Sequence, residues 1–384
     1  MKQNIIYIGS LGFPYGLATI QRQILITRGL IHSGANCRVI TRYGTEADKR
    51  VLRKGNYENI IPYECAAPKA YRSERFITRN INKFIGILNE PRLLAHYKKK
   101  GQINVMLGVR SPFFTTLYYR ILSLILGYKY IIDVNELLGT ENKVLNHRLF
   151  NTFSSYLCDG MILISDYLIS FYKNKKPSLK FAKVPIICDV NYIDSIKPIT
   201  NEQNFILYCS SASYLESIFF VIDSFCITKD KVNLKLIISG KQESIEKVRI
   251  YVEKSSKANL ITIESNIPYS LLISYYKNAN ALLIPLPETI QHKARFPHKI
   301  GEYAACKSPI ISNKWGEISN YLDEKSAFLA KRYNTKEFAE QISKCLNTNT
   351  NSLVQNAQKV AANEFDFKIV SKKIITLINR ISKN

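Results

Sequence analysis

The chain has 384 residues, of which 46% are hydrophobic, which is enough for two ordinary globular domains and excludes a disordered protein. It carries 54 Lys and Arg against 30 Asp and Glu, and this formal net charge of +24 favours polyanions, anionic membranes or phosphorylated ligands as partners. No apolar run reaches the roughly 18 residues of a spanning helix, and the first residues lack the apolar core of a signal peptide, so we expect a cytoplasmic protein.

The cysteines and histidines show no metal-binding pattern. The eight cysteines contain no C-x-x-C pair, and the five histidines form no H-x-x-x-H spacing. In a chain of this length, scattered cysteines are typical of reduced, buried thiols rather than of disulfides or zinc ligands. We therefore expect neither a protein-held metal nor a bound cofactor.

Strand-like and helix-like segments alternate along the first half, which is typical of a parallel sheet flanked by helices. A helix from about Ala18 to Ser33 follows the first strand, and Gly34 is well placed to end it. The expected strands of this half are Asn4–Gly9, Asn36–Thr41, Asn104–Gly108, Tyr130–Val134, Gly160–Ser165 and Phe181–Ile187.

A polar stretch, Asp194–Asn204, interrupts this alternation and has the composition of a linker. The strands expected after it are Phe205–Cys209, Leu234–Ser239, Leu260–Glu264, Ala281–Pro285 and Pro309–Ser312. The chain closes on an amphipathic helix, Phe365–Ser382. The sequence thus predicts an α/β protein with two doubly wound, Rossmann-like domains, residues 1–195 and 196–364, facing each other across a ligand cleft. Residues 365–384 are expected to pack back on the first domain.

The most specific segment is a loop and a helix in the second half, the helix being expected to begin near Phe296–His298. Its first amide groups can bind an anion. Arg295 and Lys299 supply two cations for a diphosphate, and Glu302 lies on the same face as Lys299. A carboxylate at that position can accept hydrogen bonds from ribose hydroxyls. A capped surface helix with an ordinary Lys–Glu pair would show the same residues.

This segment resembles the donor-binding signature of family 4 glycosyltransferases of the GT-B fold. The residues that match it are Pro297, Lys299, Glu302 and Tyr303 on the helix, Lys307–Ile311 on the next strand, and the pair Gly316–Glu317. In that family the helix glutamate holds the donor ribose, so the resemblance gives this role to Glu302. It also implies transfer of a sugar with retention of anomeric configuration, and no metal is required if the two cations suffice.

The resemblance extends over nearly the whole chain. The segment Leu11–Ala18 resembles the family's amino-terminal glycine loop, in which Gly16 would let the backbone approach the donor, although a plain strand-to-helix turn fits equally well. Asp133–Glu136 resembles the "D-x-H-E" strand end, with Asn135 replacing the histidine. Domain closure would bring Asn135 and Glu136 onto the sugar, so these two are the candidate catalytic residues.

Several positions depart from the family pattern. The E-x7-E motif is degenerate because Ala294 occupies the place of its first glutamate. The usual Arg and Lys after the first strand of the second domain are missing, so Arg295 and Lys299 are the natural substitutes, with Lys241 as a third candidate. The candidate donor-binding residues are Gly16, Ser210, Gly240, Lys241, Arg295, Phe296, Lys299 and Glu302.

Nine basic residues lie between Lys69 and Lys100, against two glutamates. On a helix of about 100° per residue, one side is expected to hold Arg72, Arg75, Arg79 and Lys83. The other side is expected to hold Ile77, Ile81, Phe84, Ile85 and Leu88. Such a helix can lie at an anionic bilayer and face the acceptor. The alternative is that the apolar side packs on the domain and the basic side is only solvated.

The expected protein is a bacterial glycosyltransferase, peripheral at the inner face of the membrane. It would move a hexose or related sugar from a UDP-sugar or GDP-sugar to a lipid-linked or surface-polysaccharide acceptor. A non-catalytic subunit that needs an active partner would explain Ala294 and the missing cations. A sugar-nucleotide epimerase would need an acid–base set that we do not find. A nucleic-acid partner is suggested by charge alone and is not expected.

Overall fold

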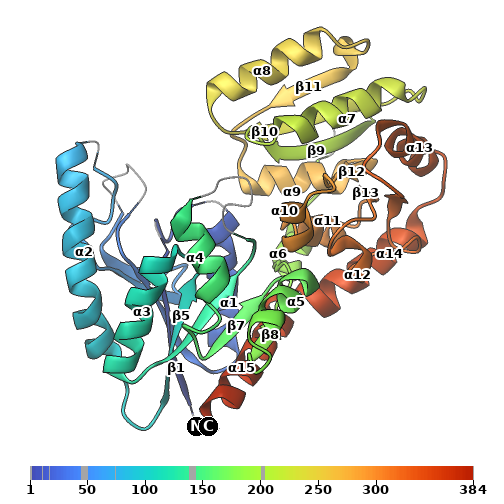
Figure 1. Cartoon of the computed structure of the whole chain (residues 1–384). Helices are drawn as coiled ribbons and strands as arrows, with labels where there is room; N and C mark the ends of the chain where they lie inside the picture. The colour runs from blue at the N-terminus through green and yellow to red at the C-terminus, as the bar shows by residue number, and fades with distance from the viewer. Residues whose placement is uncertain are drawn as a thin grey trace. The chain divides into compact units, whose positions relative to one another are not determined.

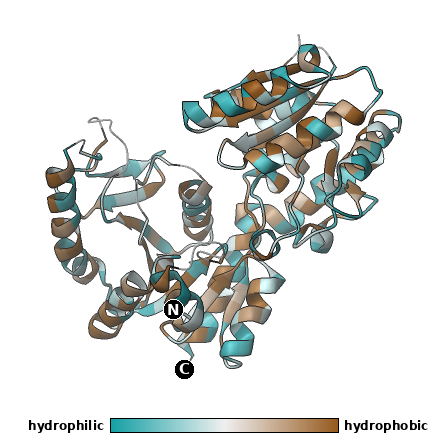
Figure 2. Cartoon of the chain, turned by 45° about the horizontal axis from the view of Figure 1, so that its top comes forward, coloured by the Kyte–Doolittle hydropathy of each residue, from teal (hydrophilic) through white to brown (hydrophobic). Residues whose placement is uncertain are grey.

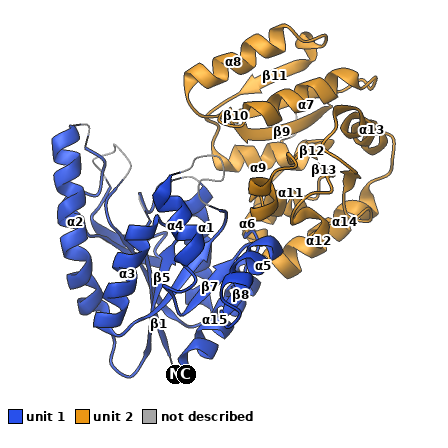
Figure 3. Cartoon of the chain, in the orientation of Figure 1, with its two compact units in different colours: residues 1–187, 367–384 blue, residues 188–366 orange. Residues whose placement is uncertain are grey.

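The computed structural model describes residues 2–10, 12–16, 18–44, 51–73, 75–137, 144–199 and 204–383. The chain divides into two compact units, Met1–Ile187 with Phe367–Asn384, and Cys188–Asp366 (Figure 3). The boundary expected after residue 195 differs from this division, because helix α6 (Val190–Ser195) packs on α11 (Lys299–Ala305) of the second unit. Residues 200–203 of the expected linker lie outside the described residues.

The first unit is built on an eight-stranded sheet of order β3-β4-β2-β1-β5-β6-β7-β8 (Figure 1). Its strands are β1 (Gln3–Ile8), β2 (Asn36–Thr41), β3 (Lys54–Tyr57), β4 (Ile61–Cys65), β5 (Ile103–Val109), β6 (Lys129–Val134), β7 (Gly160–Leu163) and β8 (Phe181–Lys183). Neighbouring strands are parallel except β3 and β4. The sequence patterns missed this edge pair because Gly55, Asn56 and Pro62 give it the composition of a turn.

The helices of the first unit are α1 (Ala18–His32), α2 (Phe76–Tyr97), α3 (Phe113–Leu126), α4 (Leu145–Phe153), α5 (Asp166–Lys175) and α15 (Phe367–Ser382). Right-handed crossovers between parallel strands place α2 to α5 on one face of the sheet. Helices α1 and α15 pack together on the other face, and their apolar side chains share one core with the strands.

Helix α15 approaches α1 closely at Gly29. A Cβ atom there would lie 1.9 Å from Ser371 Oγ and 2.5 Å from the carbonyl oxygen of Phe367, so this contact requires glycine. The side chains of Val370 and Ile374 are fully buried in the core of the first unit. The last helix of the chain is therefore an integral layer of the unit that contains the first strand.

A buried ion pair joins α1 to the sheet of the first unit. Arg22 and Asp133 are 2% and 5% exposed, and Arg22 Nε lies 2.9 Å from Asp133 Oδ2. The same carboxylate accepts a hydrogen bond from the Tyr7 hydroxyl at 2.7 Å. Arg22 also donates to the carbonyl oxygens of Pro185, at 2.7 Å, and Val184, at 3.2 Å. Burial, and then the charge of Asp133, raise the pKa of Tyr7 well above its ordinary value, so the phenol remains a donor.

The second unit holds a six-stranded parallel sheet of order β11-β10-β9-β12-β13-β14. Its strands are β9 (Phe205–Ser211), β10 (Asn233–Ser239), β11 (Ile261–Glu264), β12 (Ala281–Leu283), β13 (Ile310–Asn313) and β14 (Phe328–Ala330). Its helices, besides α6 and α11, are α7 (Leu215–Ile227), α8 (Gln242–Glu253), α9 (Tyr269–Asn278), α10 (Ile290–Ala294), α12 (Ile318–Tyr321), α13 (Thr335–Leu346) and α14 (Asn351–Val360). Two Rossmann-like units are present, and the predicted α/β class is confirmed.

Replacing Arg22 by alanine should destabilise the first unit by about 3–5 kcal/mol, because the Asp133 carboxylate is then buried without its cation. Urea denaturation followed by far-ultraviolet circular dichroism measures this change. Arg92→Ala is the control, since Arg92 is exposed on α2 and its loss should change the free energy of unfolding by less than about 0.5 kcal/mol. Equal stability of the two variants would show that the ion pair does not hold the unit together.

Candidate functional site

The expected donor residues of the second unit lie along the carboxyl edge of its sheet, where open α/β sheets bind ligands. The loops after β9 and β10 touch there, because the amide of Ala212 donates to the carbonyl oxygen of Ser239 at 2.7 Å. Gly240 has φ +147°, and a Cβ atom there would lie 3.0 Å from the Cβ of Ala212, so glycine permits the close approach. Ser210 is buried beneath these loops, whereas Lys241 is exposed.

Arg295 is held beside β9 by neutral partners. Its Nη1 donates to the hydroxyl of Tyr214 at 2.8 Å, and its guanidinium carbon lies 4.8 Å from the centre of that ring. Its Nη2 lies 2.5 Å from Nε2 of His292. A guanidinium only donates, so Nε2 accepts and the proton of His292 is on Nδ1, which lies 2.8 Å from Thr289 Oγ1. The buried Nε of Arg295 has no hydrogen-bond partner within the described part of the chain.

His292 is therefore fixed in one tautomer beside Arg295. Burial, and then the charge of Arg295, lower the pKa of His292 to about 4, so the ring is neutral near pH 7 and can accept from Arg295. The sequence analysis missed this residue because α10 is too short to show a helical period. The available signal was Thr289 three residues earlier, a capping residue that accepts from the amide of His292.

Lys299 and Glu302 lie on the first turn of α11. Glu302 Oε1 accepts a hydrogen bond from the hydroxyl of Tyr269 at 2.8 Å. Burial raises the pKa of Glu302, and the charge of Lys299 and the bond from Tyr269 oppose this rise. The side chain of Lys299 is half-buried, and it forms neither an ion pair nor a hydrogen bond with any described residue. The ordinary surface Lys–Glu pair considered from the sequence is thus not present at this helix.

Phe296 packs inside the second unit. Its side chain is 2% exposed, stacks on Tyr321 at 5.4 Å between ring centres, and meets the edge of Phe365 at 5.8 Å. The helix begins at Lys299 rather than at residues 296–298, so Phe296 belongs to the connection that precedes it. Its position gives it a packing role instead of the ligand contact expected from the sequence.

The candidate residues of the first half lie in the first unit, at the ends of β1 and β6. Glu136 accepts a hydrogen bond from Arg110 at 2.8 Å, and Asn135 is half-buried. In the glycine loop, Gly12 rather than Gly16 has a left-handed backbone, with φ +94°. A Cβ atom at Gly16 would lie 2.5 Å from an isoleucine side chain of the next turn. Residues 11 and 17 of this loop lie outside the described residues.

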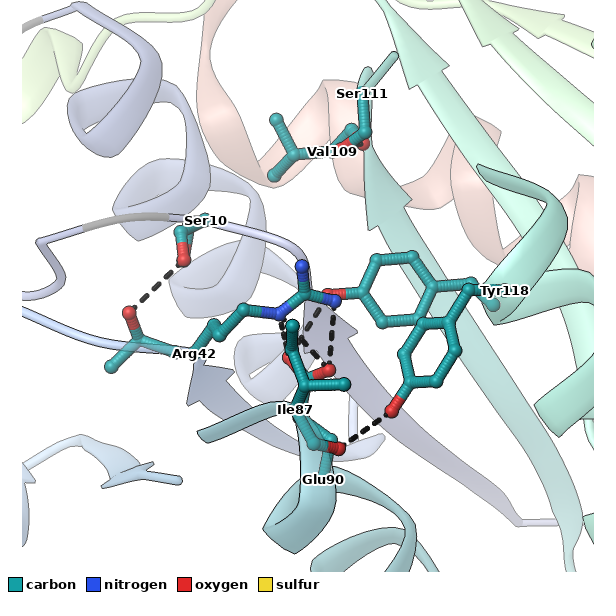
Figure 4. Close-up of polar contacts among 9 residues, drawn as sticks. Ser10, Arg42, Ile87, Glu90, Val109, Ser111 and Tyr118 are labelled. Atoms are coloured by element: carbon teal, nitrogen blue, oxygen red, sulfur yellow. Dashed lines mark hydrogen bonds and ion pairs between the residues drawn. The ribbon is translucent and has the colours of Figure 1, made fainter. Parts of the chain in front are cut away.

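Sequence reasoning missed a buried polar network at the same edge of the first sheet (Figure 4). Arg42 Nη2 lies 2.9 Å from Glu90 Oε2, and the hydroxyl of Tyr119 donates to Glu90 Oε1 at 2.9 Å. Burial raises the pKa of Glu90, and the charge of Arg42 opposes this rise. The signal in the sequence was the row Asn82, Gly86 and Glu90, spaced by four residues, which is the buried side of α2.

The basic row expected on α2 does not form one helical side. The chain at Arg75 is extended, with φ −69° and ψ 124°, so Arg72 and Arg75 precede the helix. Arg79 and Lys83 are half-buried, and Lys83 Nζ lies 5.2 Å from the ring centre of Tyr43. Of the apolar side chains expected on the other side, all but the half-buried Ile85 are exposed, so the prediction that this side packs on the domain is wrong. Glu74 lies outside the described residues.

The remaining sequence expectations concern thiols, metals and membrane spans. Each of the eight cysteines is a free thiol. Across the described residues, His, Cys, Asp and Glu side chains do not gather in groups of three or more that could hold a metal ion. Within the same residues, no helix has both the length and the hydropathy needed to cross a membrane.

Residues 190–362 match the family model described as glycosyl transferases group 1. This segment of the chain is of the group 1 glycosyltransferase type. The matched group 1 segment contains Arg295, Lys299 and Glu302, and therefore the whole carboxyl edge described for the second sheet.

A curated relative of this chain is the capsular polysaccharide biosynthesis glycosyltransferase CapM of Staphylococcus aureus. It is 25% identical over 169 residues, which are 42% of this chain and 42% of CapM. The alignment thus spans less than half the length of that relative.

Two solved structures share the fold of this chain over nearly its whole length. Sucrose-phosphate synthase from Thermosynechococcus elongatus aligns over 100% of both chains, with a TM-score of 0.74 and 14% identity. HepE of Anabaena, in complex with UDP and glucose, aligns over 98% of this chain and 100% of its own, with a TM-score of 0.74 and 14% identity. The predicted GT-B architecture is confirmed.

The pKa of His292 predicts a pH dependence of stability. Between its ordinary pKa of 6.5 and its folded pKa of about 4, the unfolded chain binds a proton that the folded chain does not. The free energy of unfolding of the second unit should therefore fall as the pH falls through this window, by at most about 3 kcal/mol.

The fluorescence of Trp315 during urea denaturation measures this change, because this single tryptophan donates to the Thr289 carbonyl oxygen at 3.2 Å. His292→Gln should flatten the dependence between pH 6.5 and 4, and His96→Gln, at an exposed site in the first unit, should leave it unchanged. A dependence that survives in His292→Gln would assign it to other groups.

Proposed function

We propose that this protein transfers a sugar from a nucleoside diphosphate donor, a UDP-sugar or a GDP-sugar, to a lipid-linked or other surface-polysaccharide acceptor. The observation that carries the proposal is Lys299, a half-buried cation without an ion-pair partner in the described chain, beside Glu302 in the group 1 segment. The capsular polysaccharide role of CapM and the UDP and glucose bound by HepE support this choice of substrates.

The charge balance of the edge suits a diphosphate. Arg295 is held by a tyrosine hydroxyl and a neutral imidazole, so its positive charge is not neutralised by these partners. Together with Lys299 it would stabilise the negative charge that grows on the leaving diphosphate. Lys241, at the end of β10, would contribute a third cation. On this account the protein's own cations replace a divalent metal ion.

Glu302 is the proposed acceptor for the ribose hydroxyls of the donor. One of its oxygens, Oε1, already accepts from Tyr269, and this bond fixes the orientation of the carboxylate. A hydrogen bond between a ribose hydroxyl and a charged carboxylate contributes roughly 1.5–3 kcal/mol. The exposed backbone around Gly240 and the loop after Ser210 would line the sugar and phosphate side.

We further propose that transfer retains the anomeric configuration, with the acceptor hydroxyl attacking from the face that the diphosphate leaves. This route needs no side-chain nucleophile. Asn135 and Glu136 would orient the sugar, and the acceptor would be met at an anionic membrane surface on the cytoplasmic side. The resemblance of the donor segment to family 4 glycosyltransferases supports this route.

A second candidate function is that of a non-catalytic subunit that needs an active partner. Ala294 favours it, because this fully buried alanine occupies the position of the first glutamate of the family motif. A subunit of this kind would bind the nucleotide weakly or not at all, which separates the two candidates.

A thermal-shift screen against UDP, GDP, ADP, TDP and CMP tests the donor site. One nucleotide should stabilise the protein, and Lys299→Ala and Glu302→Ala should each weaken its binding by roughly 10- to 100-fold, since each removes one charged contact. Lys247→Ala is the control, because Lys247 is exposed on α8 and pairs with Glu243 at 3.3 Å. No shift with any nucleotide in the folded protein would favour the non-catalytic subunit.

Turnover of the sugar nucleotide selected by this screen should persist in excess EDTA, because the proposed leaving-group stabilisation uses Arg295 and Lys299. Proton NMR of the product should show the same anomeric configuration as the donor. Loss of activity in EDTA that Mg²⁺ restores would contradict the metal-independent route, and an inverted product would contradict retention.

A further inference from the structure

Helix α2 has its polarity reversed relative to an ordinary surface helix. The side that faces the sheet carries Asn82, Gly86, Glu90 and Leu94, all buried. The opposite side carries large apolar residues, and Ile77, for example, is 73% exposed. The exposed apolar side chains of this helix are Phe76, Ile77, Ile81, Phe84 and Leu88. A surface helix in water normally turns such residues to the core.

Helix α3 shows the same reversal. Thr116 and Ser123 are fully buried, and their hydroxyls bond to the carbonyl oxygens of Ser111 and Arg120. Ile125 is 73% exposed. The exposed apolar side chains of α3 are Phe114, Ile121, Leu124 and Ile125. In two successive helices of the same layer, polar residues are thus buried and large apolar residues are exposed.

The exposed apolar side chains of α2 and α3 are continuous with those of α4. Helix α3 contacts both α2 and α4, and the rings of Phe113 and Phe153 lie 6.2 Å apart. Leu145 and Phe153 of α4 are exposed as well. We call the outer side of α2, α3 and α4 the apolar face, and its brown stretches are visible in Figure 2. Half of the exposed large apolar side chains in the described chain lie on it.

Most charges around the apolar face are positive, although Arg110 and Arg120 are paired with Glu136 and Asp159. From Arg75 to Ile132 the sequence holds ten Lys and Arg and one carboxylate, Glu90. Glu90 is completely buried and paired with Arg42, so it contributes no negative charge to the surface. Exposed lysines follow α2 at Lys98, Lys99 and Lys100. Apolar side chains surrounded by cations match a bilayer that offers acyl chains beneath anionic headgroups.

We propose that the apolar face of α2, α3 and α4 inserts shallowly into an anionic lipid bilayer. The inference goes beyond the membrane location expected from a basic helix, because the contact surface is the apolar side and not the row that includes Arg79 and Lys83. Lys83 Nζ lies 5.2 Å from the ring centre of Tyr43, and the guanidinium carbon of Arg79 lies 5.6 Å from the ring centre of Phe76. The proposal does not depend on the donor chemistry, since vesicle binding is measured without nucleotide.

Co-sedimentation of the full chain with vesicles tests the proposal. The wild type should bind vesicles of phosphatidylcholine and phosphatidylglycerol more tightly than vesicles of phosphatidylcholine alone. The double variant Ile77→Ser with Ile125→Ser should lose at least about tenfold in affinity, because two inserted side chains are removed. The matched control is Ile227→Ser with Ile250→Ser, at exposed isoleucines of the second unit, and it should bind as the wild type does.

A second variant, which adds apolar surface, tests the proposal even if the double variant misfolds. Ile125→Trp should show a blue shift of its emission on addition of anionic vesicles, and Ile250→Trp should show none. Wild-type chain that stays in the supernatant, or equal vesicle binding by the two serine double variants, would overturn the proposal. It would also be overturned if light scattering showed that the face joins two copies of the chain while vesicles remain unbound.

Discussion

In a parallel sheet each helix returns the chain to the starting edge, so every strand delivers its carboxyl end and the following loop to the same edge. This constraint gathers residues that are far apart in the sequence. In the second unit it unites the loops after β9 and β10 with Arg295, Lys299 and Glu302. In the first unit it unites Arg42, which follows β2, with Glu90 and Tyr119 from two helices. The ion pair of Arg22 and Asp133 then fixes α1 against the strand end that carries Asn135.

The arginine and lysine side chains at these edges have different partners in the two units. Arg22 and Arg42 of the first unit each have a carboxylate partner, so their charges are neutralised in place. In the second unit, Arg295 is held by a hydroxyl and a neutral imidazole, and Lys299 forms no pair with a described residue. Half-buried cations that form no ion pair lose part of their hydration without a close counter-charge, which costs free energy. An anionic ligand would offset this cost, which connects the packing of the edge to its proposed substrate.

The fold could be predicted because hydrophobic periodicity and the strand–loop–helix spacing are local properties of the sequence. That Arg295, Lys299 and Glu302 lie near one another could be predicted because they fall within eight residues of sequence. The side on which α2 packs could not be predicted, because its amphipathic pattern allowed the apolar side to face either a bilayer or the domain. The partner of Glu90, Arg42, lies 48 residues away in the sequence. The role of His292 could not be predicted either, because it depends on a tautomer that its neighbours in the folded chain determine.

The contact of α15 with α1 has a consequence for the order of folding. The core of the first unit needs Val370, Ile374 and Leu377, which a ribosome adds after the whole of the second unit. Until then the apolar side of α1, including Ile24 and Leu30, has no cover from α15. The second unit is contiguous in sequence, from Cys188 to Asp366, and can close its own core earlier. During synthesis the amino-terminal unit is therefore the later one to mature, the reverse of the usual vectorial order.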